Sequence, residues 1–223
     1  MIKKVNFIFF LIAVLVLFSC ILISCENQWM QELINELKEK KERGDSLAQD
    51  KDDGGYGGGN NTAVYNIGDT GPGGGIVFYD KGYSSENWRY LEVALTDLGP
   101  DMWASSAHNN TDIPDAVQSL GKGKSNTDAI LAEDANAPAA KACKEYRGGG
   151  KNDWFLPSKD ELNLLYLQVQ AGMIGGFSGE YWSSSQYDSI YINTAWSQDF
   201  SNGTQNGKGK IFSSCLVLPI RAF

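Results

Sequence analysis

Residues 153–162 have the sequence Asp-Trp-Phe-Leu-Pro-Ser-Lys-Asp-Glu-Leu, and they contain the start of a helix. Ser158 followed by Glu161 is a capping box, in which each side chain accepts a hydrogen bond from the backbone N–H of the other residue. Apolar residues then recur on one helical face: Leu162, Leu165 and Val169. The stretch therefore predicts a helix that begins after Ser158 and buries one face.

Two further helix signals lie upstream. Ser125 followed by Asp128 has the spacing of a second capping box, and we expect a helix to begin there. Pro138 is suited to the first turn of a helix, and it opens an Ala-rich stretch that stops at residues 148–150, which are all glycine. The middle of the chain is therefore predicted to be helical.

Strand signals occur on both sides of these helices. Residues 75–79 follow the turn sequence of residues 71–74, and together with residues 88–95 they predict a hairpin. Beyond Gly175 the chain consists of short aromatic runs separated by Gly, Asn and Ser, which is typical of a meander. The order of strands, helices and strands indicates the α+β class.

The N-terminal region has the pattern of an export signal. Lys3 and Lys4 precede an almost unbroken apolar run from residue 5 to residue 24. Two Leu-x-Ser-Cys settings end the run, at Cys20 and Cys25, and both resemble the lipobox of bacterial lipoproteins. We favour Cys25 as the lipidated cysteine, because polar residues follow it whereas an apolar segment follows Cys20.

These signals divide the chain into three parts. Residues 1–24 are predicted to be a lipoprotein signal peptide, with an uncleaved membrane helix as the alternative. Residues 25–62 are predicted to be a tether, made of a short amphipathic helix within 27–43 and a linker rich in Gly, Asp and Asn. Residues 63–223 are long enough for one substantial core.

The composition limits the classes of function. The 223 residues carry a net charge of −8, which leaves no basic surface for a phosphate backbone, so we expect no nucleic-acid binding. The chain also has 25 glycines and 26 aromatic residues, which describe an ordered, turn-rich domain rather than a disordered segment or a coiled coil.

Four motifs resemble those of bacterial surface lipoproteins that have a C-type-lectin-like domain. They lie at residues 68–78, 121–127, 153–162 and 181–186. The resemblance implies a C-type-lectin-like fold of the formylglycine-generating-enzyme type. The paired catalytic cysteines of that enzyme have no counterpart here, so the resemblance does not imply its activity.

The last forty residues are similar to the variable region of diversity-generating retroelement variable proteins, of the treponemal variable lipoprotein type. The similarity begins at residues 182–186 and ends at residues 221–223. Leu218 and Ile220 depart from it, because Arg and Val are expected there. The framework positions between are Ala195, Trp196, Gln198, Phe200, Gly203, Gln205, Lys208 and Lys210.

In that family a reverse transcriptase rewrites template adenines, so that asparagine codons come to encode many other residues, although not Glu, Gln, Lys, Met or Trp. The resemblance thus implies a variable region at about residues 182–223, and the alternative is an ordinary polar strand-and-loop region. The ligand-binding residues that it implies are Asp188, Ser189, Ile190, Tyr191, Ile192, Asn193, Thr194, Ser197, Asp199, Ser201, Asn202, Thr204, Asn206, Gly207 and Gly209.

Aromatic residues of the same region are assigned two roles. Trp182, Trp196 and Phe200 are expected to lie in the core or in the floor of a pocket. Tyr191 is expected to be the aromatic anchor of a binding patch, since tyrosine combines a large apolar ring with a polar tip.

The sequence gives little support for catalysis or metal binding. His108 is the only histidine, no Gly-x-Ser-x-Gly surrounds a serine, and we expect His108 to be a solvated loop residue. Gly123-Lys124-Ser125 lacks the first glycine of a P-loop. The calcium-binding motifs of sugar-binding lectins are missing as well. We therefore expect no enzyme activity, no cofactor and no metal.

Cys143 and Cys215 form an even pair in an oxidising compartment. A disulfide between them would suit a lectin-like fold, but Cys215 lies where rewritten codons would fall, so the pairing stays open.

The leading hypothesis is a monomeric lipoprotein, lipid-anchored at the outer-membrane surface, that binds a protein or another macromolecular ligand. The alternatives are a structural or adhesive envelope lipoprotein without a diversified site, and an enzyme of unknown reaction.

Overall fold

The computed structural model describes residues 32, 35–36, 38–39, 63–187 and 190–223. The predicted signal peptide, Cys25 and the linker of residues 44–62 lie outside the described residues. The chain divides into two units, residues 1–44 and 45–223. In the first unit the described residues are helical and exposed, as the predicted amphipathic helix requires. None of the helices described is long and apolar enough to cross a membrane.

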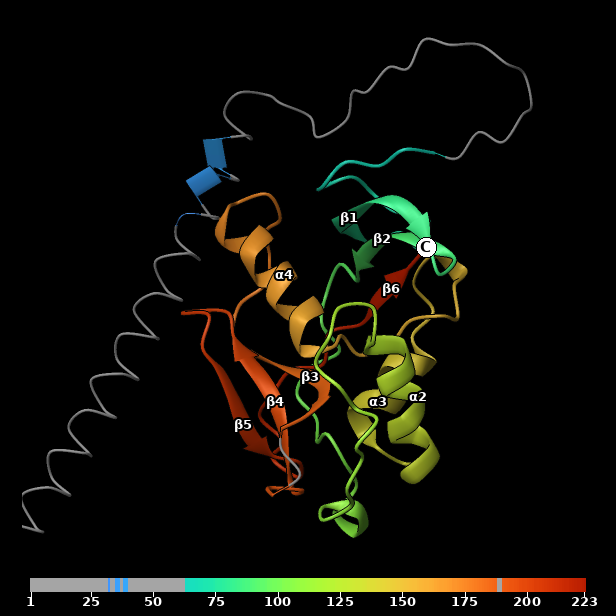
Figure 1. Cartoon of the computed structure of the whole chain (residues 1–223), viewed down its shortest axis with the longest axis vertical. Coiled ribbons are helices and arrows are strands. Elements are labelled where there is room, and N and C mark those ends of the chain that lie inside the picture. The colour runs from blue at the N-terminus through green and yellow to red at the C-terminus, as the bar shows by residue number, and fades with distance from the viewer. Residues whose placement is uncertain (1–31, 33–34, 37, 40–62, 188–189) are drawn as a thin grey trace, which may run out of the picture. The chain divides into compact units, whose positions relative to one another are not determined.

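Residues 63–187 and 190–223 form three α-helices and two antiparallel sheets, so the α+β prediction is confirmed (Figure 1). Along the chain, the helices α2, α3 and α4 follow the two strands of the first hairpin and precede the three strands of the meander. In chain order the elements are β1 (Ile76–Ser85), β2 (Trp88–Val93), the 3-10 helix η1 (Ser106–His108), α2 (Gly123–Glu133), α3 (Pro138–Glu145), the 3-10 helix η2 (Gly148–Gly150), α4 (Lys159–Gln170), β3 (Glu180–Gln186), β4 (Thr194–Asp199), β5 (Gln205–Gly209) and β6 (Ile220–Ala222).

The first sheet contains the predicted hairpin and closes with the last strand of the chain. Its strand order is β1-β2-β6, and Val93 is paired with both Ile76 and Ile220. The second sheet is the predicted meander, in the order β3-β4-β5. The segment after β5 connects the two sheets, because Leu216 bridges Tyr181 of β3 before the chain enters β6.

The local helix signals are confirmed at two starts and wrong at one. Ser158 and Glu161 form the capping box of α4, and Pro138 is the first residue of α3. The box predicted at Ser125 is wrong, since α2 begins at Gly123 and Ser125 lies inside it. The Ser125 hydroxyl donates instead to the carbonyl of Lys122, 3.0 Å away.

Helix α4 packs against both sheets, and α2 packs against the second sheet. Helix α4 contacts β1 of the first sheet and both β3 and β4 of the second, while α2 contacts β3 and α3 (Figure 1). A buried apolar cluster joins α2, α3, β3 and β4, and its largest members are Trp103, Ile113, Ile130, Leu156 and Trp182. The second sheet therefore rests on a packed core.

Candidate functional site

The candidate residues lie on the second sheet and on the loops at its ends. The loop 187–193 leads from β3 into β4, the turn 200–204 joins β4 to β5, and the loop 210–214 follows β5. Thr194 pairs with Gly209, and the backbone N–H of Lys210 donates to the carbonyl of Asn193 at 2.8 Å. The first and last loops are thereby held together at one end of the sheet.

Burial separates most candidate residues from the framework residues that alternate with them. Among the framework residues Ala195, Gln198 and Lys210 are 0% exposed, and Phe200 is 3% exposed. Asp188 and Ser189 lie outside the described residues. The candidates Ile192, Thr194 and Asp199 are half-buried. The exposed candidates are Ile190, Tyr191, Asn193, Ser201, Asn202, Thr204, Asn206, Gly207 and Gly209.

Ser197 contradicts its assignment as a surface ligand-binding residue. It is 1% exposed, and its hydroxyl donates to the Glu180 carboxylate at 2.7 Å. Glu180 also forms an ion pair with Lys208. Ser197 is therefore a buried polar residue of the central strand, and its hydroxyl contacts one member of this ion pair.

Glycines of the second sheet differ in the room around them. Gly203 has a φ of +81°, and a Cβ there would come within 2.6 Å of the Tyr166 ring. The position therefore requires glycine. A Cβ at Gly207 would meet the Tyr187 ring at 2.6 Å, so a side chain at Gly207 requires Tyr187 to move. Gly209 has open space around it. Of the two candidate glycines, Gly209 alone can be replaced without a steric clash.

Four exposed apolar side chains occupy the two loops at the joined end of the sheet. We call this group the apolar tip: Ile190 is 79% exposed, Tyr191 58%, Ile211 44% and Phe212 51%. Lys208 places its ammonium 5.1 Å from the centre of the Phe212 ring. Ile211 and Phe212 were not among the predicted site residues, although both lie in the interval of the variable region.

Trp196 contacts an aromatic ring and an ammonium group but is only half-buried. The Tyr187 ring lies 4.4 Å from it, and the Lys159 ammonium lies 3.9 Å from its ring centre. Its Nε1 is buried and has no hydrogen-bond partner among the described residues. The expectation of a core or floor position is thus confirmed for Trp182 and Phe200, which are 0% and 3% exposed, and only partly for Trp196.

The turn after β4 satisfies its own polar groups. The Asp199 carboxylate accepts from the hydroxyl of Ser201 at 2.7 Å, from the backbone N–H of Ser201 at 2.8 Å and from the Asn202 amide at 3.2 Å. The Ser201 hydroxyl is the largest of the effects that lower the pKa of Asp199. This turn keeps its shape through short-range contacts.

A buried lysine supports the loops from beneath. Lys210 donates to the Thr111 carbonyl at 2.7 Å and to the Gln186 side-chain oxygen at 2.8 Å, and burial lowers the pKa of Lys210 to about 8. The Gln186 amide donates in turn to Asp112. A cleft of about 400 Å³ opens beside Gln186, and its other lining residues are Asp112, Ile113, Pro114, Ala116, Val117 and Gln118.

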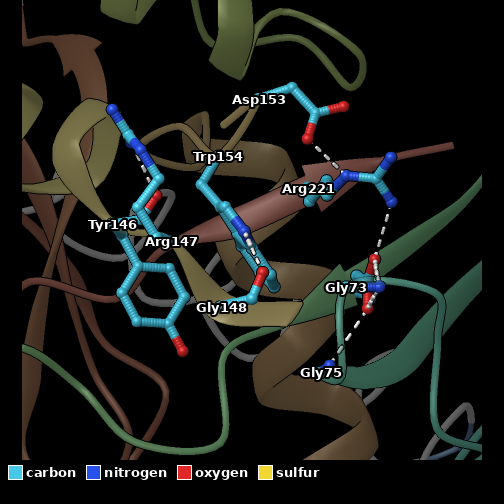
Figure 2. A network of polar contacts seen from close by, with 9 residues as sticks. Gly73, Gly75, Tyr146, Arg147, Gly148, Asp153, Trp154 and Arg221 are labelled. Carbon is cyan, nitrogen blue, oxygen red and sulfur yellow. Dashed lines mark hydrogen bonds and ion pairs between the residues drawn. The ribbon is translucent and has the colours of Figure 1, made fainter. Parts of the chain in front are cut away.

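The motifs at residues 68–78 and 153–162 meet the end of the chain in a buried polar cluster. Glu92 is fully buried and accepts from the backbone N–H groups of Gly73 and Gly75 at 2.9 to 3.1 Å. Arg221 donates to Glu92 at 2.8 Å and also to Asp153 (Figure 2). We call these five residues the Glu92 cluster. Its partners are all within the fold, so these motif residues are structural.

Glu161 is a second buried carboxylate that accepts backbone hydrogen bonds, and it contacts the motif at residues 121–127. Its carboxylate accepts from the backbone N–H groups of Gly121 at 2.9 Å and Ser158 at 2.7 Å. Burial raises the pKa of Glu161 to about 7, although these hydrogen bonds oppose the shift. A Cβ at Gly123 would lie 2.2 Å from the carboxylate. The glycines of this motif therefore accommodate Glu161.

His108, predicted to be a solvated loop residue, ends the 3-10 helix η1 with its side chain 40% exposed, and it also has polar partners. Its Nδ1 lies 3.0 Å from the Ser105 hydroxyl and 3.4 Å from the Asp134 carboxylate. Both contacts use the same ring nitrogen, whereas a catalytic Ser-His-Asp arrangement uses one nitrogen for each partner. The group is therefore not arranged as a triad.

The two cysteines of the domain are free thiols in the same buried apolar cluster. Cys143 and Cys215 are both 0% exposed, and burial raises the pKa of each thiol. Burial also shows that Cys215 is not a surface position. The described residues contain no group of three side chains that could hold a metal ion.

The chain was compared with known proteins. No protein-family model matches it, and no curated protein matches it either.

Proposed function

We propose that this chain is a surface-displayed lipoprotein of the retroelement variable type, whose second sheet presents a diversifiable site for a protein or another macromolecular ligand. The observation that carries the proposal is the burial pattern along residues 190–210. The framework residues Ala195, Gln198, Phe200 and Lys210 are buried and the other four framework residues are half-buried, while most candidate side chains reach solvent from the same strands and loops. Such a surface can change its chemistry with little effect on stability.

The shape and chemistry of the surface favour a broad partner. Exposed candidates run along loops, turn and strands and include Asn, Ser and Thr beside the apolar tip. Protein–protein interfaces combine polar residues with exposed aromatic ones, whereas small molecules are bound in deep apolar pockets. Tyr191 and Phe212 are the aromatic residues that we propose as anchors of the contact.

We also propose that the fold is the C-type-lectin-like fold of the formylglycine-generating-enzyme type. The proposal rests on the resemblance of the motifs, and it is supported by their roles as structural contacts around Glu92 and Glu161. Buried polar contacts of this kind constrain a fold without prescribing an activity.

Sequencing the same locus in sibling isolates tests diversification directly. The proposal predicts substitutions at the exposed positions, an unchanged Gln198 and Lys210, and a near-copy of codons 182–223 beside a reverse-transcriptase gene. An invariant interval and no near-copy would instead indicate the non-diversified structural or adhesive lipoprotein, in which the apolar tip is a fixed contact.

Anchoring is tested by labelling with an alkyne fatty acid. The proposed lipidation of Cys25 predicts that Cys25→Ala abolishes the label and releases the protein from the membrane fraction. Cys20→Ala is the matched control and should keep the label. Label that survives in Cys25→Ala but is lost in Cys20→Ala would move the cleavage site to Cys20.

The proposed binding needs no metal. Asp199, which is the one carboxylate among the described candidate residues, already accepts hydrogen bonds from Ser201 and Asn202. A receptor selected from a surface-display library should therefore remain bound in EDTA. Loss of binding on chelation, or full competition by a simple sugar, would replace this proposal with a calcium-dependent lectin.

A further inference from the structure

We call the exposed candidate residues of the second sheet, together with the apolar tip, the candidate surface. A second recess lies on the first sheet, apart from the strands that carry this surface. It encloses about 350 Å³, which is within the size range of ligand-binding sites. The segment that enters the domain, the end of β1, the start of β2 and the residue after β6 all contribute to it. We call it the aromatic cleft, and its lining residues are Ala63, Tyr65, Ser84, Arg89, Tyr90 and Phe223.

Three aromatic rings form the apolar side of the aromatic cleft. Tyr65 meets Tyr90 and Phe223 edge-on, with ring centres 5.4 and 5.2 Å apart, and Tyr90 stacks on Phe223 at 5.4 Å. Tyr90 is 4% exposed, while Tyr65 and Phe223 are half-buried. Mutual contact fixes the rings, so the surface that they offer is already ordered before a ligand arrives.

The polar side of the aromatic cleft is rich in hydrogen-bond donors. The Tyr90 hydroxyl oxygen accepts from the backbone N–H of Tyr65 at 3.3 Å, and its own hydrogen has no acceptor among the described residues. Arg89 binds Asp80 through Nε and Nη2, and its Nη1 has no partner within the described part of the chain. The guanidinium lies 4.8 Å from the Tyr90 ring centre. Asp80 balances the charge of Arg89, so this edge offers hydrogen-bond donors from Tyr90 and Arg89 rather than a net charge.

We infer that the aromatic cleft binds a proline-rich peptide in the extended polyproline conformation. A proline residue offers an apolar ring and a carbonyl acceptor, and it has no backbone N–H that would need an acceptor. Its ring matches the wall of Tyr65, Tyr90 and Phe223. Its carbonyl, which is negative at oxygen, matches the donors of Tyr90 and Arg89. Aromatic grooves with such donors recognise polyproline helices in other folds.

Fluorescence anisotropy of labelled decaproline tests the inference with the full chain in detergent micelles. We expect saturable binding of decaproline and none of a Gly-Ser decamer. Tyr90→Phe keeps the ring and removes one donor, and it should weaken binding about fivefold. Tyr65→Ala removes one wall and should weaken binding about tenfold. Tyr191→Ala, the same change on the second sheet, should leave binding unchanged.

Each alternative result overturns the inference. Equal binding of the Gly-Ser decamer shows non-specific association, and absence of saturable decaproline binding shows that the cleft takes no such peptide. Loss of binding in Tyr191→Ala moves the contact to the candidate surface. If 3-phenylpropionamide binds and decaproline does not, the cleft is a small-molecule site. Tyr90→Phe decides the outcome if circular dichroism shows that Tyr65→Ala is unfolded. Failure here leaves the proposed function intact, because that function uses the other sheet.

Discussion

The Glu92 cluster and the candidate surface differ in where their polar side chains find hydrogen-bond partners. In the Glu92 cluster each charged side chain is held by partners from distant parts of the sequence, as when Arg221 binds Glu92. On the candidate surface polar side chains bind within their own turn, as Asp199 does, or reach solvent. A change in the first region leaves a buried group without a partner, whereas a change in the second leaves the fold intact. The two regions should therefore respond very differently to mutation.

The largest expected effect is at the centre of the Glu92 cluster. Glu92→Gln removes a buried charge that faces Arg221 and two backbone donors, so the free energy of unfolding should fall by about 3–5 kcal/mol. Urea denaturation measures it. Glu180→Gln is the matched control, because its ion pair with Lys208 is partly exposed, and it should cost about 1 kcal/mol or less. Equal losses would remove the distinction between the regions.

Trp154 and Trp196 allow the stability of the two regions to be compared with the same substitution. Trp154 is fully buried in the motif region, so Trp154→Ala should lower the free energy of unfolding by about 3–5 kcal/mol. Trp196 is half-buried on the second sheet, and Trp196→Ala should cost less, about 1–2 kcal/mol. Thermal unfolding followed by circular dichroism ranks the variants. The reverse order would show that the second sheet depends on Trp196 more than its exposure implies.

Ser197 is a test within the candidate region itself. Ser197→Ala removes a buried hydrogen bond to Glu180 and should cost about 1 kcal/mol. Thr204→Ala changes an exposed neighbour of the same sheet and should stay within about 0.5 kcal/mol of the parent chain. Chemical denaturation curves measured side by side distinguish the two. A neutral Ser197→Ala would show that the hydrogen bond to Glu180 does not contribute to stability.

The effect at Lys210 differs from the others because it depends on pH. Burial lowers the pKa of Lys210 from its ordinary value of 10.5 to about 8 in the folded chain. The folded chain therefore binds fewer protons than the unfolded chain between these values, so this contribution to stability is present above 10.5 and is lost as pH falls to about 8. The difference in unfolding free energy between Lys210→Met and the parent should vary across this window. A constant difference would contradict the lowered pKa.

Local patterns predicted the parts of the fold that depend on neighbours in sequence. The capping box at Ser158, the start of α3 at Pro138 and the first hairpin all follow from short-range chemistry. The start of α2 was missed because Gly121 and Gly123 are positioned by Glu161, which lies some forty residues later. A sequence window does not contain such a contact.

The exposure of the candidate residues was predicted correctly where polar residues reach solvent, as at Asn193 and Thr204, and it was wrong at Ser197. Ser197 is polar but faces inward, and sequence alone does not reveal which face of a polar strand is covered. Ile211 and Phe212 are apolar and follow a framework lysine, so they have the pattern of core residues, yet they are exposed. Their position depends on how Lys210 is held beneath the loops by Thr111 and Gln186.

The most direct test of the account is a saturation library of residues 190–216, displayed on cells and sorted for folded protein with a conformation-sensitive binder. The account predicts that exposed positions such as Tyr191, Thr204 and Gly209 accept most residues. It predicts that Ala195, Ser197, Gln198, Phe200, Lys210 and Cys215 accept few. Uniform tolerance, or intolerance at the exposed positions, would contradict a surface that changes independently of the fold.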